Sequence, residues 1–322
     1  MKTNYPAIYI ICHKHDYFLT KILVSSIRYY YPETEIFLIK DQIHGPFSTS
    51  ELEKYFKVKI VILGKRRFGW TSAKIFLLLS KKLKGEKIFL LDSDVIFVGK
   101  VLDLIAPYVE TNDFIISPEF KHKPGSEGFT NNYYDFDWFK DKYSSLTFPG
   151  FTFNTGNIMI TAGTLNKSEI SPYFDVEKFP YWTDLGRKKL PTRDQSLLNV
   201  LLPIKVSKKI YNWKNLPFMW WYREEATREL KIEDVVSAKF PYIIHWAGGV
   251  RVPFLPAMMR SDLLLFFQRR YYSKLPFGTI RFYSNFFIEG LKSYLSPLKP
   301  KIYTFEKSPR NIWNWMHKFK RG

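Results

Sequence analysis

Residues 87–94 read KIFLLDSD, an apolar run that ends in two carboxylates, Asp92 and Asp94, on either side of Ser93. A run this short and rich in Ile, Phe and Leu predicts a buried strand. Because side chains two positions apart in an extended chain point the same way, we expect Asp92 and Asp94 to project together from the carboxyl end of the strand. Two adjacent negative charges favour a neutralising Mg²⁺ or Mn²⁺ ion, although the same tripeptide can merely start a turn or cap a helix.

Short apolar runs alternate with amphipathic segments on both sides of this stretch. Strands are predicted at residues 7–12, 35–39, 59–63 and 87–91, with helices at 17–30, 49–56 and 71–83. This alternation implies right-handed crossovers and a mostly parallel sheet covered on both faces, which is an α/β fold. Such sheets bind ligands at the carboxyl ends of their strands. Further on, we expect strands at 114–117, 153–161 and 242–246, a helix at 194–202, and a long polar and aromatic loop at 119–150.

The composition indicates a globular, basic protein. Of its 322 residues, 46% are hydrophobic and 18% aromatic, which excludes disorder as the dominant state. The net charge of +19 favours acidic partners such as nucleic acid, anionic lipid or nucleotide phosphates. Cys12 is the only cysteine, so no disulfide forms within the chain, which fits a reducing compartment. With no run of about 18 apolar residues and no signal-peptide pattern, we expect a cytoplasmic protein, soluble or peripheral to the membrane.

The positive charge is concentrated at the end of the chain. Residues 256–322 hold 13 basic, 3 acidic and 15 aromatic side chains, and the composition shifts after Pro253 and Pro256. We therefore predict a main folded domain at 1–255 and a basic, aromatic, helical extension at 256–322. Aromatic and basic side chains together favour the interface of an anionic membrane, at its inner face in this case. The alternatives are an extension that packs on the core and, less favoured, a nucleic-acid-binding tail.

Three further segments carry polar side chains suited to a ligand site. Residues 242–251 read YIIHWAGGVR, so a strand delivers His245 and is followed by two glycines and Arg251. Imidazole can complete a metal site with two carboxylates, and guanidinium can bind phosphate. Residues 153–157 read FNTGN and residues 193–196 read RDQS, whose amides suit sugar hydroxyls. Alone, each segment is equally explained as a buried strand end, a turn or a helix cap.

Taken in order, the four segments resemble the motifs of glycosyltransferases with the GT-A fold, most closely family 8, the retaining galactosyl- and glucosyltransferase type. That family has a DxD after an apolar strand, an FN-x-G strand, a DQ-x-x-x-N helix and an HxxGxxK segment. The corresponding residues here are Asp92, Ser93 and Asp94; Phe153, Asn154 and Gly156; Asp194, Gln195 and Asn199; and His245, Gly248 and Arg251. The resemblance covers residues 7–254 and implies a Rossmann-like nucleotide-binding sheet flanked by helices.

The resemblance also implies roles for individual residues. Asp92, Asp94 and His245 would hold the metal ion, and Lys74 would meet the donor. Asn154 and Asp194 would hold hydroxyls of the donor sugar, and Gln195 would lie beneath its anomeric carbon. The donor-binding set comprises Lys74, Asp92, Ser93, Asp94, Asn154, Asp194, Gly248 and Arg251, and the catalytic pair is Gln195 and Asp194. Two positions differ from the family pattern. Arg251 stands where the family has lysine. The first strand ends in Cys12 and His13 rather than in the family's nucleobase-binding residues, so the identity of the nucleobase stays open, with UDP favoured.

The resulting hypothesis is a metal-dependent glycosyltransferase. It would move a hexose from a nucleotide diphosphate sugar to a saccharide or lipid-linked glycan acceptor in polysaccharide biosynthesis, with retention of anomeric configuration, using Mn²⁺ or Mg²⁺. A nucleotidyltransferase and a basic nucleic-acid-binding protein are the alternatives, but no Gly-rich phosphate loop follows the first strand and the charge lies mainly in the tail. Among the aromatic residues of 129–151, Trp138 is the candidate for acceptor contact, while we expect most of the others to pack in the core.

Overall fold

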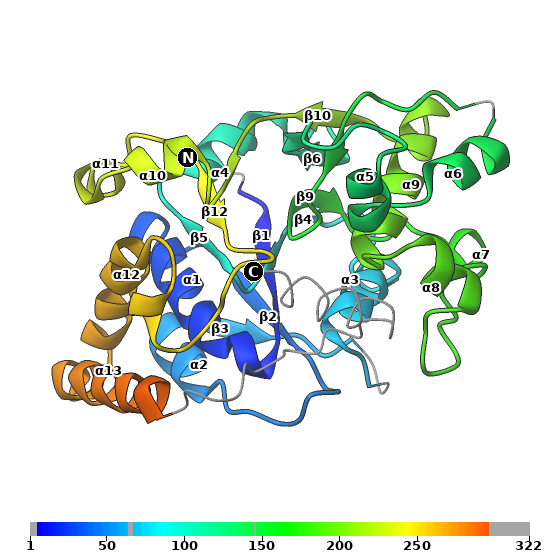
Figure 1. Cartoon of the computed structure of the whole chain (residues 1–322). Helices are drawn as coiled ribbons and strands as arrows, with labels where there is room; N and C mark the ends of the chain where they lie inside the picture. The colour runs from blue at the N-terminus through cyan, green and yellow to red at the C-terminus, as the bar shows by residue number, and fades with distance from the viewer. Residues whose placement is uncertain (1–4, 64–66, 145, 296–322) are drawn as a thin grey trace, which may run out of the picture. The chain divides into compact units, whose positions relative to one another are not determined.

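The computed structural model describes residues 5–63, 67–144 and 146–295, and its centre is a seven-stranded sheet in the order β10-β6-β9-β4-β1-β2-β3 (Figure 1). The strands β3, β2, β1 and β4 run parallel, as do β6 and β10, whereas β9 is antiparallel to both β4 and β6. The strands of this sheet are β1 (Ala7–Cys12), β2 (Ile36–Lys40), β3 (Val58–Ile60), β4 (Lys87–Asp92), β6 (Phe114–Ile116), β9 (Asn157–Thr161) and β10 (Trp213–Asn215).

Two small sheets accompany the large one. The first has the order β11-β12-β5, with β11 parallel and β5 antiparallel to β12, and the second is the antiparallel pair of β7 and β8. Their strands are β5 (Val95–Phe97), β7 (Pro118–Glu119), β8 (Thr152–Phe153), β11 (Met219–Trp221) and β12 (Ile243–His245). The strand β5 begins three residues after β4 ends, so the chain passes from the large sheet to a small one at Asp92-Ser93-Asp94.

Helices connect these strands. The α-helices are α1 (Tyr17–Tyr30), α2 (Ser50–Phe56), α3 (Trp70–Leu78), α4 (Val101–Ile105), α5 (Glu127–Asn132), α6 (Phe136–Lys142), α7 (Lys167–Ile170), α8 (Asp184–Lys189), α9 (Asp194–Ser207), α10 (Glu225–Glu229), α11 (Ile232–Val236), α12 (Ser261–Ser273) and α13 (Gly278–Leu295). Short 3₁₀ turns lie at η1 (Lys14–Asp16), η2 (Ala106–Tyr108) and η3 (Leu255–Ala257).

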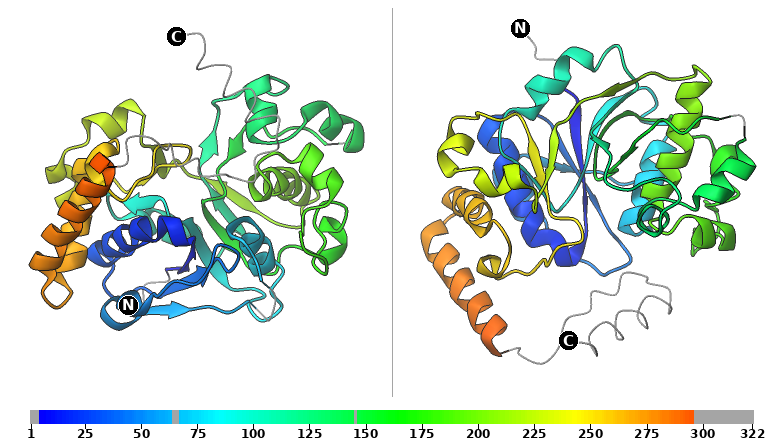
Figure 2. Two further views of the ribbon diagram at one scale, coloured as in Figure 1. Left: turned by 60° about the horizontal axis from the view of Figure 1, so that its bottom comes forward. Right: turned by 45° about the horizontal axis from the view of Figure 1, so that its top comes forward.

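The central strands are buried on both faces because alternate side chains enter two different cores. From β1, Tyr9 and Ile11 pack with α3 and α9, whereas Ile8 and Ile10 pack with α1 and α2. These two pairs of helices accordingly lie on opposite faces of the sheet (Figure 2). A third core joins α1 to β5, β12 and α12. As a result, β12 and the segment that follows it are held close to the carboxyl end of β4.

The predicted α/β class and mostly parallel sheet are confirmed, and the predicted strands and helices before residue 113 are all present, although α3 ends at Leu78 rather than at residue 83. Two predictions were wrong. Residues 119–150 are not one loop, because α5 and α6 form there, capped by Ser126 and Asp135. The expected strand at 153–161 is two strands, β8 and β9, separated by a turn.

The chain divides into two compact units, residues 1–282 and 283–322. In the first unit, Phe267 and Tyr271 of α12 are buried against the cores, so this part of the predicted extension packs on the main fold. Residues 296–322, which hold much of the predicted membrane-binding tail, lie outside the described residues. Within the described part of the chain, none of the helices combines the length and the apolar content that a membrane-spanning segment requires. The boundary at 255/256 stays a prediction.

Candidate active site

The side chains of Asp92 and Asp94 lie at the junction between the large sheet and the small one. Asp92 is the last residue of β4, and Ser93 and Asp94 form the turn that leads into β5. Ligand atoms of Asp92, Asp94 and His245 all lie within 4.8 Å of one another. The two aspartates therefore lie close together, as predicted. The reason differs from the prediction, because the chain turns after Asp92 instead of staying extended, and β12 brings His245 to the same place by pairing with β5.

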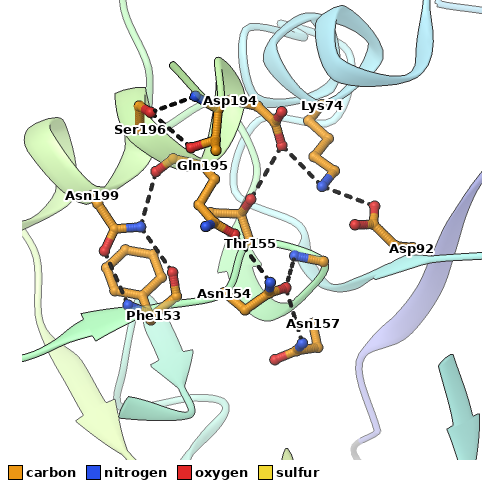
Figure 3. Close-up of polar contacts among 12 residues, drawn as sticks. Lys74, Asp92, Phe153, Asn154, Thr155, Asn157, Asp194, Gln195, Ser196 and Asn199 are labelled. Carbon is orange, nitrogen blue, oxygen red and sulfur yellow. Dashed lines mark hydrogen bonds and ion pairs between the residues drawn. The ribbon is translucent and has the colours of Figure 1, made fainter. Parts of the chain in front are cut away.

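Asp92 and Asp194 share the ammonium group of Lys74. The Nζ atom of Lys74 lies 2.8 Å from Asp92 Oδ1 and 2.9 Å from Asp194 Oδ2 (Figure 3). The side chains of Lys74 and Asp194 are only 2% and 3% exposed, and that of Asp92 is 20% exposed. Burial alone would lower the pKa of Lys74, but Asp194 and Asp92 outweigh it and raise that pKa, so the lysine stays charged.

The carboxylate of Asp94 contacts a histidine and an arginine. His245 Nε2 lies 3.1 Å from Asp94 Oδ1, and Arg251 Nη1 lies 2.7 Å from Asp94 Oδ2 and 3.1 Å from Asp16 Oδ2. Burial opposes ionisation of Asp94, yet His245 and Arg251 hold its pKa well below the usual range. Burial raises the pKa of Asp16 to about 6, with Asp94 and Asp92 adding to the rise and Arg251 opposing it.

The turn between β8 and β9 presents an amide network to this junction. Asn154 Oδ1 accepts hydrogen bonds from the backbone N–H of Gly156 at 2.7 Å and from Asn157 Nδ2 at 3.2 Å. A Cβ atom on Gly156 would lie 2.3 Å from Asp92 Oδ2, so only glycine lets the turn approach the carboxylate this closely. Asn157 Nδ2 lies 3.3 Å from His245 Nδ1, which links the turn to the small sheet.

Helix α9 positions two further predicted residues. Gln195 Oε1 accepts from Asn154 Nδ2 at 3.0 Å (Figure 3), and Gln195 Nε2 donates to the backbone oxygen of Asn132 at 3.1 Å. Asn199 exchanges hydrogen bonds with the backbone of Phe153, which fixes α9 against β8. The carboxylate of Asp194 also accepts from the hydroxyl of Thr155 at 3.1 Å. The structure thus places Lys74, Asn154, Asp194 and Gln195 close together, in two adjoining sets of contacts: Lys74 with Asp194, and Asn154 with Gln195.

The remaining predicted residues lie nearby with less defined contacts. Ser93 is buried in the turn after β4. Gly248 has a φ of +69°, a conformation that favours glycine, in the turn that carries the chain from β12 to Arg251. Trp138 packs edge-on against Tyr143 and Tyr173 at the surface of the first core.

Several residues of the site were not assigned roles from the sequence. Asp16 contacts Arg251, Asn157 contacts His245, and Trp221 stacks on His245 with ring centroids 5.2 Å apart and planes inclined by 11°. Asn157 directly follows the FNTG segment, so the sequence could have indicated it as a site residue. Asp16 and Trp221 come from separate elements, and only the folded chain brings them to the site.

The donor set fits a divalent cation. Asp92, Asp94 and His245 supply two carboxylates and one imidazole, ligands that suit Mn²⁺ and Mg²⁺. In addition, the Oδ1 atom of Asn157 is buried and has no hydrogen-bond partner among the described residues. An unsatisfied oxygen beside His245 is compatible with a bound cation or ligand hydroxyl.

A second cluster of metal-ligand types lies at the ends of β1 and β2. Ligand atoms of His13, Asp41 and His44 lie within 4.8 Å of one another. However, Asp41 already accepts from the backbone N–H groups of Ile43, His44 and Trp70, which anchors this loop to the start of α3. Its carboxylate oxygens are thus occupied by structural contacts.

Comparison with solved structures identifies the fold. The bifunctional glycosyltransferase WbbM in its apo form matches 88% of this chain at 14% identity with a TM-score of 0.57, and this chain spans only 52% of that protein. The galactosyltransferase LgtC, solved with donor and acceptor sugar analogs, matches 83% of this chain and 95% of its own at 15% identity with a TM-score of 0.52. No known family profile matches the sequence, and no curated protein matches it. The chain therefore has the GT-A fold of these glycosyltransferases.

Proposed function

We propose that the protein is a metal-dependent glycosyltransferase of the family 8 type, which moves a hexose from a nucleotide diphosphate sugar to a saccharide or lipid-linked glycan acceptor. The observation that carries this proposal is the convergence of Asp92, Asp94 and His245 at the carboxyl end of a GT-A sheet, beside a buried amide and lysine network. A bound Mn²⁺ or Mg²⁺ would supply a positive charge that stabilises the leaving diphosphate.

The remaining residues of the site would bind and orient the donor. Arg251, 19% exposed, can donate to diphosphate oxygens, and Gly248 and Ser93 would belong to the same donor-binding set. Asn154 and Asp194 would hold sugar hydroxyls. Gln195, fixed on both sides by Asn154 and the backbone of Asn132, would lie beneath the anomeric carbon.

The central test is the loss of metal-dependent binding in Asp94→Asn. This variant keeps the size of the side chain but removes the charge, so we expect nucleoside diphosphate binding in Mn²⁺ and release of nucleoside diphosphate from UDP-hexoses to fall by about 100-fold or more. Glu225→Gln, an exposed carboxylate outside the site, is the matched control. Full activity of Asp94→Asn, or activity unchanged by EDTA, would contradict the metal site.

We further propose retention of anomeric configuration and UDP as the nucleotide, both on the family resemblance. The amide of Gln195 is a weak nucleophile, and its contacts do not select a mechanism. NMR of the first-formed product decides the stereochemistry, because an inverted anomer refutes retention. Competition among nucleoside diphosphates for the Mn²⁺-loaded enzyme decides the base.

Finally, we propose that the protein acts at the inner face of an anionic membrane. In α13, exposed apolar residues recur at helical spacing: Ile280, Tyr283, Phe287, Leu291 and Tyr294 are 46–81% exposed. Such a stripe, together with the net charge of +10 in residues 256–322, suits a lipid interface.

The membrane proposal is tested by cosedimentation with anionic liposomes at low and high salt. Phe287→Glu combined with charge reversal at Lys318, Lys320 and Arg321 should abolish binding, whereas the parent should bind at low salt. Arg269 and Arg270 are left unchanged, because the Arg270 guanidinium packs over Tyr29. Equal binding by parent and variant would refute membrane association through this extension.

A further inference from the structure

Three side-chain amides form a chain of hydrogen bonds that ends at the imidazole of His245. Gln195 Nε2 donates to the backbone oxygen of Asn132, and Gln195 Oε1 accepts from Asn154 Nδ2. Asn154 Oδ1 in turn accepts from Asn157 Nδ2 at 3.2 Å (Figure 3). The same Nδ2 atom lies 3.3 Å from His245 Nδ1. Asn157, which had no predicted role, is fully buried on β9.

Two backbone groups fix the direction of this amide chain. A backbone oxygen only accepts, so the Gln195 atom that contacts Asn132 is nitrogen and the other end of that amide is oxygen. A backbone N–H only donates, so the Asn154 atom that lies 2.7 Å from the Gly156 nitrogen is oxygen. Both constraints give Asn154 the same orientation. The Asn157 atom that faces Asn154 Oδ1 is therefore nitrogen, because turning this amide would place two oxygens 3.2 Å apart.

The direction of the amide chain determines which nitrogen of His245 carries the proton. An amide nitrogen donates and does not accept, so Nδ1 accepts from Asn157 and the proton of the neutral imidazole lies on Nε2. Nε2 lies 3.1 Å from Asp94 Oδ1 and donates to that carboxylate. Trp221 stacks on the same ring, with planes inclined by 11°, and holds the ring in this orientation. In the structure, His245 is thus a hydrogen-bond donor toward the candidate metal site.

A histidine that ligates a metal ion needs the opposite arrangement. Its ligating nitrogen offers a lone pair, so the proton of the neutral ring lies on the other nitrogen and is donated to a carboxylate, a carbonyl oxygen or water. For His245 that second nitrogen is Nδ1, and its proton would face the N–H of Asn157, which is unfavourable. Asn157 Oδ1 has no partner among the described residues, but it cannot turn toward Nδ1 without facing Asn154 Oδ1.

We propose that Asn157 is a positioning residue that weakens the binding of a divalent cation by His245. It acts through the imidazole, by keeping the proton on the nitrogen that faces Asp94. The inference rests on the proposed metal-dependent function and goes beyond it, because it names a residue outside the metal ligands that sets the affinity for the metal. Removing the amide of Asn157 should therefore strengthen cation binding, although this side chain packs beside the histidine.

The test measures the Mn²⁺ affinity of the full chain by electron paramagnetic resonance. Asn157→Leu keeps the branched shape of the side chain but has no donor, so we expect an affinity about tenfold higher than that of the parent. A merely structural role predicts the opposite sign, because disturbed packing beside His245 would weaken the site. Asn157→Val, with a smaller side chain, should shift the affinity in the same direction as leucine. Thr164→Val is the control and should change nothing, because it removes an unpartnered buried hydroxyl beyond the end of β9 that lies away from the site.

The position of the imidazole proton is measured separately. In ¹⁵N NMR of the metal-free parent at about pH 8, where an ordinary imidazole is neutral, we expect the Nε2–H form of His245, with His245→Asn used to assign the signal. An Nδ1–H form, or an affinity of the Asn157 variants equal to or below that of the parent, overturns the proposal. Absence of Mn²⁺ binding in the parent refutes the metal site and the role of Asn157 together. Binding in the parent that Asp94→Asn abolishes supports the metal site, and the Asn157 variants then decide this proposal alone.

Discussion

Replacement of Lys74 by methionine should destabilise the fold strongly and in a pH-dependent way. The lysine Nζ atom lies within 2.9 Å of both Asp92 and Asp194, and the side chains of Lys74 and Asp194 are almost fully buried. Removing one partner of a buried ion pair costs about 3–5 kcal/mol, because it leaves an uncompensated charge. Domains have about 5–15 kcal/mol of stability, so this loss is a large share of the total.

The ability of Asp194 to take up a proton sets a ceiling on that loss. Protonating a carboxyl of ordinary pKa 3.8 costs about 1.4 kcal/mol per pH unit above that value, or about 4 kcal/mol at pH 7 and under 2 kcal/mol at pH 5. Without Lys74, the pKa of the buried Asp194 rises further in the folded state. A carboxyl whose folded pKa is raised binds more protons folded than unfolded, so the variant loses stability as the pH rises from 3.8.

Urea unfolding of parent and variant at pH 7 and pH 5 measures this difference. We expect a deficit of about 3–4 kcal/mol at pH 7 that falls to about 2 kcal/mol or less at pH 5. Asp194→Asn in the same chain should recover most of the loss at pH 7. Lys167→Met, which breaks a pair with Glu177 whose side chains are 62% and 55% exposed, should cost less than about 1 kcal/mol. A Lys74→Met deficit no larger than this control, or equal at both pH values, would refute the reasoning.

Three other predictions concern the neighbouring groups. Arg251→Met removes the guanidinium that competes with a metal ion for Asp94, so the affinity for Mn²⁺ in the absence of nucleotide should rise about tenfold. Electron paramagnetic resonance measures this affinity, and an unchanged or lower value argues against competition. Gly156→Ala places a Cβ atom against Asp92, and should cost about 1–3 kcal/mol in urea unfolding and weaken Mn²⁺ binding. The pKa of His13 is lowered to about 4, mainly by burial, so the parent loses stability as the pH falls from 6.5 towards 4. His13→Asn should reduce that loss by about 1–2 kcal/mol, measured by urea unfolding at those pH values. An identical dependence of stability on pH in parent and variant would contradict this prediction.

Local patterns in the sequence predicted the central sheet because its strands are buried on both faces. Runs such as Ala7–Cys12 must then be apolar at every position, and this pattern is visible without any tertiary information. Helices α5 and α6 were missed because they have only 6 and 7 residues, too few for helical periodicity. Their capping residues, Ser126 and Asp135, were the available signals.

The site was predictable in its residue types but not in its contacts. The order of the motifs placed Asp92, Asn154, Asp194 and His245 at strand or helix ends, where side chains face a common edge of the sheet. Which of these side chains contact one another depends on the distances between helices and strands in the folded chain, and no local sequence pattern encodes those distances. The contact of Asp16 with Arg251 is an example, since it joins two segments 235 positions apart in the chain.

The charges of the folded site themselves favour a divalent cation. Four carboxylates converge there with two cations, which is a formal excess of two negative charges; these groups are Asp16, Asp92, Asp94, Asp194, Lys74 and Arg251. The two cations are not equivalent. Lys74 is 2% exposed and contacts two carboxylates, so it stays in place, whereas Arg251 is 19% exposed and retains a second partner if it leaves Asp94. Asp94 would therefore hold a divalent ion whose charge balances the site, and Arg251 can bind phosphate while it keeps its contact with Asp16.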